Sequence, residues 1–325
     1  MKFQFLGTSS GTPSKTRNVS GLALSAHGGR DWALVDCGEG TQHRILGTNW
    51  SLHALGAVFI THLHGDHCYG LPGLLASAGM LNRTAPLTIV GPAPLRRFLD
   101  GVIETTELAL PFALHFVDVD AVAAGDAPVL PGLAVRATPL SHRIPSYAYS
   151  LTEREVATKL DAAKLRATGV APGEAWGRLQ RGEDVALPDG RLLRAADFLL
   201  APRRPSKIIV GGDNDTPDLL LDELRDAHVL VHEATYTQAV LDHVGPGPRH
   251  SSARMTARTA AAAEVPNLVL THFSPRYSQA GGPLSMAAIE EEARAEYGGR
   301  LFLARDFDRY RLDRDGVLAP VDAAA

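Results

Sequence analysis

A cluster of candidate metal ligands occupies residues 61–67, which read THLHGDH and follow an apolar run. Imidazole nitrogens and carboxylate oxygens are ligands that Zn²⁺ and similar divalent cations accept. In an extended stretch, residues two apart share a face, so His62 and His64 can point at one ion. A glycine then lets the chain turn, and Asp66 with His67 can address a second ion. The alternative is a polar loop with surface histidines, which leaves the crowding of these four side chains after a strand unexplained.

Three further candidate ligands, His142, Asp213 and His272, also follow apolar runs that end at turn residues. Short runs of this kind are typical of buried strands. Ligands at the strand ends of an α/β sheet converge on one edge of the sheet, where such sheets place their sites. The runs that lead to candidate ligands are residues 57–60, 133–138, 207–210 and 267–271.

The number of candidate ligands is sufficient for two ions. One ion would be held by His62, His64 and His142, and the other by Asp66, His67 and His272. The two carboxylate oxygens of Asp213 could bridge them. Two ions about 3.5–4 Å apart can clamp the attacking and leaving oxygens of a phosphodiester, and water on such an ion has a pKa of about 7.

The pattern His-x-His-x-Asp-His resembles the signature of the metallo-β-lactamase superfamily. Further segments are similar to the ribonuclease Z family, endonucleases that remove the 3′ trailer from precursor tRNA. They follow the family's order and are Phe5-Leu6-Gly7-Thr8, Pro13-Ser14-Lys15-Thr16-Arg17-Asn18, Asp36-Cys37-Gly38-Glu39-Gly40-Thr41-Gln42, Tyr69-Gly70-Leu71-Pro72-Gly73-Leu74-Leu75, His232-Glu233-Ala234-Thr235 and His272-Phe273-Ser274-Pro275-Arg276-Tyr277. The sequence departs from the family in the arm motif, where a Gly-Pro pair is replaced by Pro172-Gly173-Glu174.

The resemblance implies an α/β fold, a four-layer αββα metallo-β-lactamase sandwich over residues 1–325. Residues 151–205 would form an inserted flexible arm that binds tRNA. It also implies two Zn²⁺ per subunit, with Mn²⁺ or another divalent metal as the alternative, and a homodimer. The expected metal ligands are His62, His64, Asp66, His67, His142, Asp213 and His272.

The resemblance further implies a zinc-dependent endoribonuclease that cuts precursor tRNA 3′ of the discriminator nucleotide. The tRNA would keep a 3′-hydroxyl, and the trailer would carry a 5′-phosphate. Asp66 would accept a proton, and His250, held by Glu233, would give one to the leaving ribose oxygen. Expected phosphate contacts are Lys15, Arg17, Arg276 and Tyr277, which can form charge-assisted hydrogen bonds.

Length and composition agree with a single large domain. The chain has 325 residues, 45% of them hydrophobic, and can bury a full core. Residues 1–6 are expected to begin a strand. Because no run of 18 apolar residues occurs, the sequence predicts neither export nor membrane insertion. Cys37 and Cys68 are expected to be reduced thiols, and the protein cytoplasmic.

Charge singles out the expected arm. The whole chain has a net charge of −4, but residues 151–207 carry 11 basic and 8 acidic side chains. A local basic excess matters more for phosphate affinity than the overall balance does. Within this stretch the pattern predicts a helix over 151–171 and a hairpin over 185–193, turning at Pro188-Asp189-Gly190.

Two other functions are compatible with the motifs. One is a small-molecule hydrolase of the same superfamily, arylsulfatase-like or acting on cyclic phosphodiesters, which would lack an arm that grips tRNA. The other is a non-catalytic RNA-binding scaffold that kept the fold. The long insert argues against the first, and the complete ligand set argues against the second.

Overall fold

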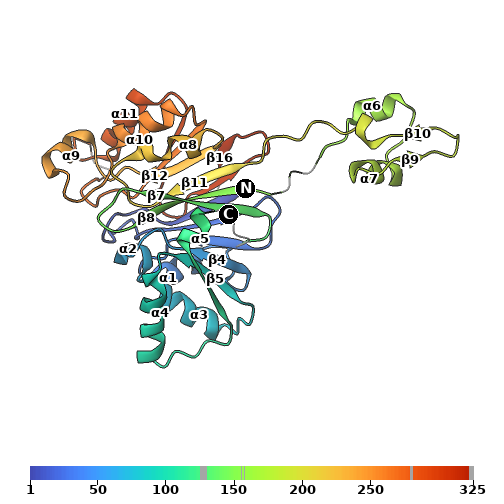
Figure 1. Cartoon of the computed structure of the whole chain (residues 1–325). Coiled ribbons are helices and arrows are strands. Elements are labelled where there is room, and N and C mark those ends of the chain that lie inside the picture. Colours follow the sequence, from blue (N-terminus) through green and yellow to red (C-terminus); the bar gives the residue numbers. More distant parts are fainter. Residues whose placement is uncertain (125–129, 155, 157, 279–280, 322–325) are drawn as a thin grey trace. The chain divides into compact units, whose positions relative to one another are not determined.

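The computed structural model describes residues 1–124, 130–154, 156, 158–278 and 281–321. Within these ranges, two large β-sheets carry the main body of the chain (Figure 1). The larger sheet has the order β16 (Leu318–Pro320), β15 (Arg309–Leu312), β1 (Lys2–Gly7), β2 (Gly21–Ser25), β3 (Trp32–Val35), β4 (Leu55–Phe59), β5 (Leu87–Gly91) and β6 (Leu114–Asp118). The other sheet has the order β14 (Arg300–Leu303), β13 (Asn267–Thr271), β12 (Val229–Glu233), β11 (Lys207–Gly211), β8 (Ser146–Glu153) and β7 (Leu133–Leu140).

Strand direction places the candidate ligands at one end of each sheet. Strands β3 to β6 are parallel to one another, as are β11 to β14. Strand β8 is antiparallel to both β7 and β11, so β7 runs in the same direction as β11. The four apolar runs expected to precede ligands are therefore all strands, and the expected N-terminal strand is β1.

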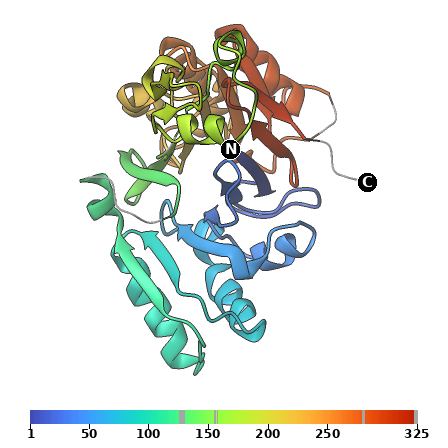
Figure 2. The same cartoon turned by 90° about the vertical axis from the view of Figure 1, so that its right-hand side faces the viewer.

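Helices cover the outer face of each sheet, and the two groups lie on opposite sides of the strands in Figure 2. The group of the larger sheet is α1 (Thr41–Leu46), η1 (Leu52–Ala54), α2 (Gly65–Cys68), α3 (Leu71–Met80) and α4 (Pro94–Thr105). Helix α5 (Val119–Ala123) instead packs Val119 and Val122 into the apolar cluster between the sheets. The group of the other sheet is η3 (Pro217–Leu220), α8 (Leu221–Leu224), α9 (Gln238–Val244), α10 (Ala253–Ala262) and α11 (Met286–Glu296). Serine side chains cap the two longest helices of this second group: Ser252 accepts from Met255 N–H, and Ser285 accepts from Ala288 N–H.

Three apolar clusters hold these layers together. The central cluster lies between the sheets and joins Phe3 and Phe59 of the larger sheet to Tyr149, Ile208 and Val231 of the other. A second cluster joins the outer face of the larger sheet to α1, α3 and α4, and a third joins the other sheet to α10 and α11. Burial of apolar area on both faces of each sheet is the main stabilising contribution to such a sandwich. The predicted αββα architecture is confirmed.

Residues 154–205 form a separate compact unit. It contains α6 (Ala162–Ala167), α7 (Glu174–Gln180), β9 (Val185–Ala186), β10 (Leu192–Leu193) and η2 (Ala195–Asp197). Its own small core includes Leu165, Leu179, Val185 and Phe198. Strands β9 and β10 pair antiparallel, so the hairpin predicted over 185–193 is confirmed.

The helix predicted over 151–171 is wrong in its first part. Residues up to Glu153 belong to β8, where Leu151 faces the central core and pairs with Ile208 of β11. The helical part that the structure describes is α6, and residues 155 and 157 lie outside the described ranges. The apolar spacing at 151–165 fits a helix locally, but the hydrogen bonds supplied by β7 and β11 decide in favour of a strand.

No helix in the described part of the chain combines the length and the apolar character needed to cross a bilayer.

Candidate metal centre

The segment after β4 carries four of the expected ligands into one largely buried cluster. His62 and His64 face each other, with His62 Nε2 3.1 Å from His64 Nδ1. The chain then turns into the short helix α2, which presents Asp66 and His67. His142, which follows β7, completes the first group, with its Nε2 3.1 Å from His64 Nδ1.

Asp213 lies between two groups of ligands and turns one carboxylate oxygen to each. Its Oδ2 is 3.6 Å from His62 Nε2 and 3.7 Å from His142 Nε2. Its Oδ1 is 3.4 Å from His67 Nε2 and 3.3 Å from His272 Nε2. This is the arrangement that a carboxylate bridging two cations requires.

The second group consists of His67, His272 and Asp66. The two Nε2 atoms are 3.3 Å apart, and Asp66 Oδ2 lies 3.5 Å from His67 Nε2 and 3.4 Å from His272 Nε2. The backbone N–H of Gly11 donates to the same Asp66 oxygen at 2.7 Å, which ties the N-terminal loop to the cluster. The structure thus brings together all seven side chains expected to bind metal.

The spacing of these atoms matches the edges of a coordination polyhedron. Four ligands at about 2.0–2.2 Å from a tetrahedral ion lie about 3.3 Å from one another. The nitrogen–nitrogen distances of 3.1–3.3 Å and the contacts of Asp213 agree with that value. Nitrogen lone pairs that converge this closely repel one another unless a positive charge lies between them. The donor set therefore fits a pair of divalent cations.

Outer hydrogen bonds orient four of the five imidazoles by holding the proton on Nδ1. The acceptor of His67 is Asp36 Oδ2 at 2.7 Å, and the acceptor of His142 is the Arg249 carbonyl at 2.8 Å. His62 and His272 each contact a threonine hydroxyl at 3.1 Å, on Thr61 and Thr235. A neutral imidazole held in this way presents its Nε2 lone pair to the cluster.

The two threonines belong to matching networks, one on each sheet. Thr61 Oγ1 donates to Asp36 Oδ2 at 2.9 Å, and Thr235 Oγ1 donates to Glu233 Oε2 at 2.5 Å. Asp36 follows β3, and Glu233 ends β12. Each carboxylate accepts from one threonine and from one further histidine: His67 in the case of Asp36, His250 in the case of Glu233.

The buried carboxylates and imidazoles of this cluster shift one another's pKa values. Burial alone would raise the pKa of Asp213, but His272, His67 and His62 hold it well below its usual range. Burial opposes protonation of His67, yet Asp66, Asp213 and Asp36 raise its pKa well above the usual value. Burial and the neighbouring His67 keep the pKa of His62 well below normal, so that imidazole stays neutral, as a metal ligand must be.

His250 lies beside this cluster and is held by Glu233. Its Nδ1 is 3.1 Å from Glu233 Oε2, 3.2 Å from Oε1 and 3.7 Å from Asp213 Oδ2. Burial disfavours the charged ring, but Glu233 outweighs burial and raises the pKa of His250 to about 9. The nearby Tyr236 ring, 6.0 Å away between centroids, packs edge-on against His250.

Comparison with known proteins identifies the family. The chain is 54% identical over 327 residues to the ribonuclease Z of Marinobacter nauticus, with 99% of each chain covered. It is 48% identical over 322 residues to that of Pseudomonas putida strain GB-1, covering 99% of this chain and all of that one. The chain belongs to the ribonuclease Z family. It is accordingly a hydrolytic endoribonuclease.

A solved structure agrees with this membership in the ribonuclease Z family. The short form of human tRNase Z superposes with a TM-score of 0.65 at 26% identity, covering 95% of this chain and 98% of that one. A family model described as "Anti-Pycsar protein Apyc1" matches residues 1–160. That match includes the ligands up to His142 but stops before Asp213, Glu233, His250 and His272, so it spans only part of the cluster.

The four expected phosphate contacts of this ribonuclease Z family member occupy different environments. Lys15 is exposed, and Arg276 is exposed with its guanidinium 5.6 Å from the Tyr236 ring, close to His250. Tyr277 is only 7% exposed, and its hydroxyl accepts the backbone N–H of Thr237 at 2.7 Å. Its hydroxyl is engaged within the protein, and a phosphate contact by Tyr277 stays a prediction.

The side chain of Arg17 also forms contacts within the protein. Its Nη1 donates to Thr8 Oγ1 at 2.6 Å and to the Ala304 carbonyl at 2.7 Å, and its guanidinium packs over the Phe273 ring. These contacts fasten the N-terminal loop to the segment that carries His272. Arg17 thus positions the loop that reaches Asp66, and it also lines a cavity beside α11.

The sequence alone gives no role to Asp36, although Asp36 begins one of the motifs shared with the ribonuclease Z family. Asp36 could have been identified by its position directly after a strand, because His272 occupies the same kind of position. Both residues adopt left-handed backbone conformations, with φ of 60° at Asp36 and 56° at His272. Gly38 is required nearby, because a Cβ there would lie 2.3 Å from the Asp66 carbonyl oxygen.

Proposed function

We propose that this chain is a zinc-dependent endoribonuclease that removes the 3′ trailer from precursor tRNA. It cuts 3′ of the discriminator nucleotide and leaves a 3′-hydroxyl on the tRNA and a 5′-phosphate on the trailer. The observation that supports the metal assignment most strongly is the position of Asp213, whose Oδ1 and Oδ2 face two different groups of ligands. The names of the relatives, ribonuclease Z and tRNase Z, support the substrate.

We propose His62, His64, His142 and Asp213 as ligands of one ion. Asp66, His67, His272 and Asp213 serve the other. A donor set dominated by imidazole favours Zn²⁺, and Mn²⁺ or another divalent metal is the alternative that the same ligands accept. Two bound ions act as Lewis acids on the phosphodiester and lower the pKa of water at the site.

The protein's own groups then orient the reactants and move protons. Asp66, fixed by Gly11 N–H, has its carboxylate at the second group of ligands, where it can orient water and accept a proton. Glu233 holds His250 through Nδ1, which directs the other ring nitrogen to the substrate side. His250 there donates a proton to the leaving ribose 3′-oxygen. Exposed Lys15 and Arg276 offer positive charge to neighbouring phosphates.

The separate unit of residues 154–205 is, in this proposal, an arm that grips tRNA away from the scissile bond. Its basic excess supports contact with phosphates. Arg166 packs on the Trp176 ring at 5.8 Å, and Lys164 lies over Phe198 at 5.4 Å, so cationic side chains are held on an aromatic framework.

The direct test is to incubate metal-loaded protein with a trailer-bearing precursor tRNA and to count bound metal. We expect two metal ions per chain and a single cut after the discriminator nucleotide. Cleavage at other positions, or a 5′-hydroxyl on the released trailer, would contradict the proposal. Hydrolysis of cyclic nucleotides without any cleavage of the precursor tRNA would favour the small-molecule hydrolase instead.

Replacing His250 by alanine tests its role as general acid. A ribose 3′-oxygen is a poor leaving group, and general acid catalysis is typically worth about 10²–10⁴ in rate. Bis-nitrophenyl phosphate releases nitrophenolate without protonation. We expect His250→Ala to slow precursor cleavage by about that factor and to leave kcat for bis-nitrophenyl phosphate nearly unchanged. Equal losses on both substrates would show that His250 acts through the metal ligands instead.

We also propose a homodimer. Exposed apolar side chains gather at α1 and α3: Leu46 is 80% exposed, Met80 84% and Leu81 53%. Leu46 and Leu81 line one hollow of about 380 Å³, so they belong to one surface. Such a surface is typical of an interface between copies.

The dimer is tested by sedimentation. The double variant Leu46→Glu/Met80→Glu is expected to shift the chain to a monomer, because both charges would be buried in the interface. Leu219→Glu, at an exposed apolar position on η3, is the matched control and should stay dimeric. A monomeric wild-type protein at micromolar concentration would refute the dimer.

We propose a cytoplasmic location. Cys37 and Cys68 are both buried and free, which supports a reducing compartment. Burial raises the pKa of Cys68 to about 12, so it remains a thiol beside His67 and does not act as a thiolate ligand.

A further inference from the structure

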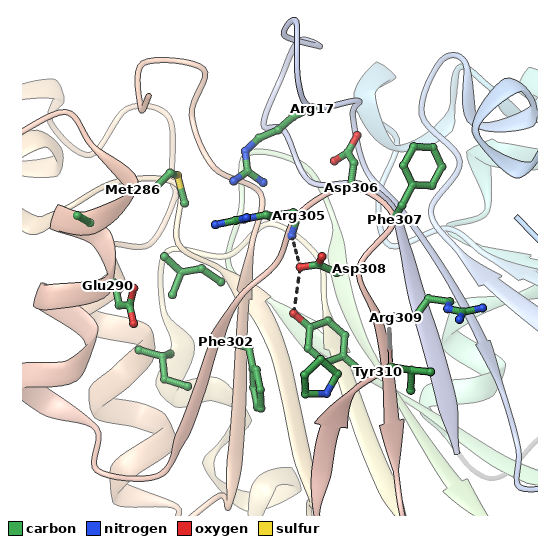
Figure 3. A pocket seen from close by; sticks show the side chains of 15 residues that line it. Arg17, Met286, Glu290, Phe302, Arg305, Asp306, Phe307, Asp308, Arg309 and Tyr310 are labelled. Atoms are coloured by element: carbon green, nitrogen blue, oxygen red, sulfur yellow. Dashed lines mark hydrogen bonds between the residues drawn. The ribbon is translucent and has the colours of Figure 1, made fainter. Parts of the chain in front are cut away.

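A second cavity, of about 720 Å³, lies between α11 and the chain that runs from β14 into β15 (Figure 3). Its size is that of sites for small organic ligands. Among the described residues that line it, none belongs to the seven proposed metal ligands. The cavity is therefore a different place from the metal centre.

Two guanidinium groups face this cavity. Figure 3 shows Arg17 and Arg305 pointing into the same space beside α11. In the part of the chain that the structure describes, neither forms an ion pair with a carboxylate; Arg17 donates to the neutral oxygens of Thr8 and Ala304. Burial lowers the pKa of Arg17 and Arg305 lowers it further, while Asp306 opposes both. An anion in the cavity would be attracted by both guanidinium charges.

The carboxylates nearby are occupied by other donors. Asp306 accepts from the Thr8 hydroxyl at 2.7 Å, from Asn18 N–H at 2.6 Å and from Arg44 at 2.8 Å. Asp308 accepts from the backbone N–H of Arg305 at 2.9 Å and from the Tyr310 hydroxyl at 3.2 Å. The two arginine side chains thus retain donors for a ligand, and guanidinium groups match phosphate oxygens in geometry.

The remaining walls suit the rest of a nucleotide. Phe302 and Tyr310 pack edge-to-face, with ring centroids 5.3 Å apart, and Met286 of α11 adds a further apolar surface. Tyr310 is buried and stacks on Phe3, so it supports Phe302 from behind, and the half-buried Phe302 offers the surface for a planar base. Glu290 on α11 points toward the cavity in Figure 3 and can accept hydrogen bonds from an amino group or a ribose hydroxyl.

We propose that this cavity binds a nucleoside phosphate, with the phosphate on Arg17 and Arg305 and the base against Phe302. The ligand is either a free nucleotide or the 5′-phosphorylated end of an RNA chain, which share this chemistry. The proposal does not depend on the tRNA assignment, because the cavity is separate from the metal centre.

Arg305 is the residue to replace. Arg17 is unsuitable, because its contacts hold the loop whose Gly11 N–H reaches Asp66. Arg305 is exposed, and no carboxylate among the described residues forms an ion pair with its side chain. Arg309, in β15, also lines the cavity, but its side chain points away from the two arginines in Figure 3, and it serves as the matched control.

The test is calorimetric titration of the metal-loaded full-length protein with adenosine 5′-monophosphate. We expect one nucleotide per chain, binding at least about tenfold weaker in Arg305→Gln, and within about twofold of wild type in Arg309→Gln. Absence of binding at millimolar nucleotide would overturn the proposal. Equal binding by wild type and Arg305→Gln would also overturn it, since the nucleotide would then lie elsewhere, such as at the metal centre.

Two further titrations identify the source of the ligand. A short oligoribonucleotide with a 5′-phosphate should outcompete the free nucleotide if the natural ligand is an RNA end, and it should bind more weakly if the natural ligand is a free nucleotide. In either case binding must weaken in Arg305→Gln. Inorganic phosphate that binds as tightly as the nucleotide would contradict the base-binding part, and an oligoribonucleotide that binds equally well without its phosphate would contradict the phosphate-binding part.

Discussion

Replacing Asp213 by alanine is expected to remove at least one of the two metal ions and nearly all cleavage. Oδ1 and Oδ2 of this buried side chain face different groups of histidines, so no other residue can replace both contacts. Two-metal clamping contributes several kcal/mol to transition-state stabilisation, which corresponds to a loss of about a thousandfold or more. Metal content by atomic emission and cleavage of a precursor tRNA measure the two effects on the same preparation.

Matched variants separate the bridge from general effects on the fold. Asp213→Asn keeps one carbonyl oxygen and is expected to retain more metal than the alanine variant. Asp215→Ala removes a neighbouring carboxylate that accepts from the Thr216 hydroxyl, and it should leave metal content unchanged. If Asp213→Ala bound two metal ions and turned over at a near-normal rate, the dinuclear assignment would have to be abandoned.

Removing residues 154–205 is expected to cripple precursor tRNA cleavage and to spare hydrolysis of a small chromogenic phosphodiester. Two charge-assisted contacts of about 1.5–3 kcal/mol each would account for a loss of about 10²-fold or more. The small substrate needs only the metal centre, so its kcat/KM should stay within about twofold of wild type.

The structure shows how to make this deletion without disturbing the sheet. The backbone N–H of Glu153 donates to the Ser206 carbonyl at 2.9 Å, and Ser206 N–H donates to the Glu153 carboxylate at 2.9 Å. These residues continue the antiparallel pairing of β8 with β11, in which Thr152 lies opposite Lys207. An Asn-Gly turn between Glu153 and Ser206 would close a two-residue hairpin. Parallel losses on both substrates would assign the unit a structural role.

The sequence by itself determined the chemical nature of the site and the layers that carry it. Four candidate ligands are visible directly in residues 61–67. Local geometry is enough to place them relative to one another, because only a strand end and a glycine turn separate them. The strands before His142, Asp213 and His272 were predictable for the same reason: short β-branched runs bounded by turn residues have a strong local preference. The motifs, read in order, predicted the family that the comparisons confirm.

Only the tertiary structure decided which groups act together. The pairing of Asp36 with His67 joins residues that follow two different strands, and no local pattern encodes that contact. The structure moved the start of the separate unit from 151 to 154, because residues 151–153 find hydrogen-bonding partners in β7 and β11. It also decided the environment of Tyr277, an expected phosphate contact: side-chain type is visible in a sequence, but burial and a hydroxyl already bonded to Thr237 are products of packing.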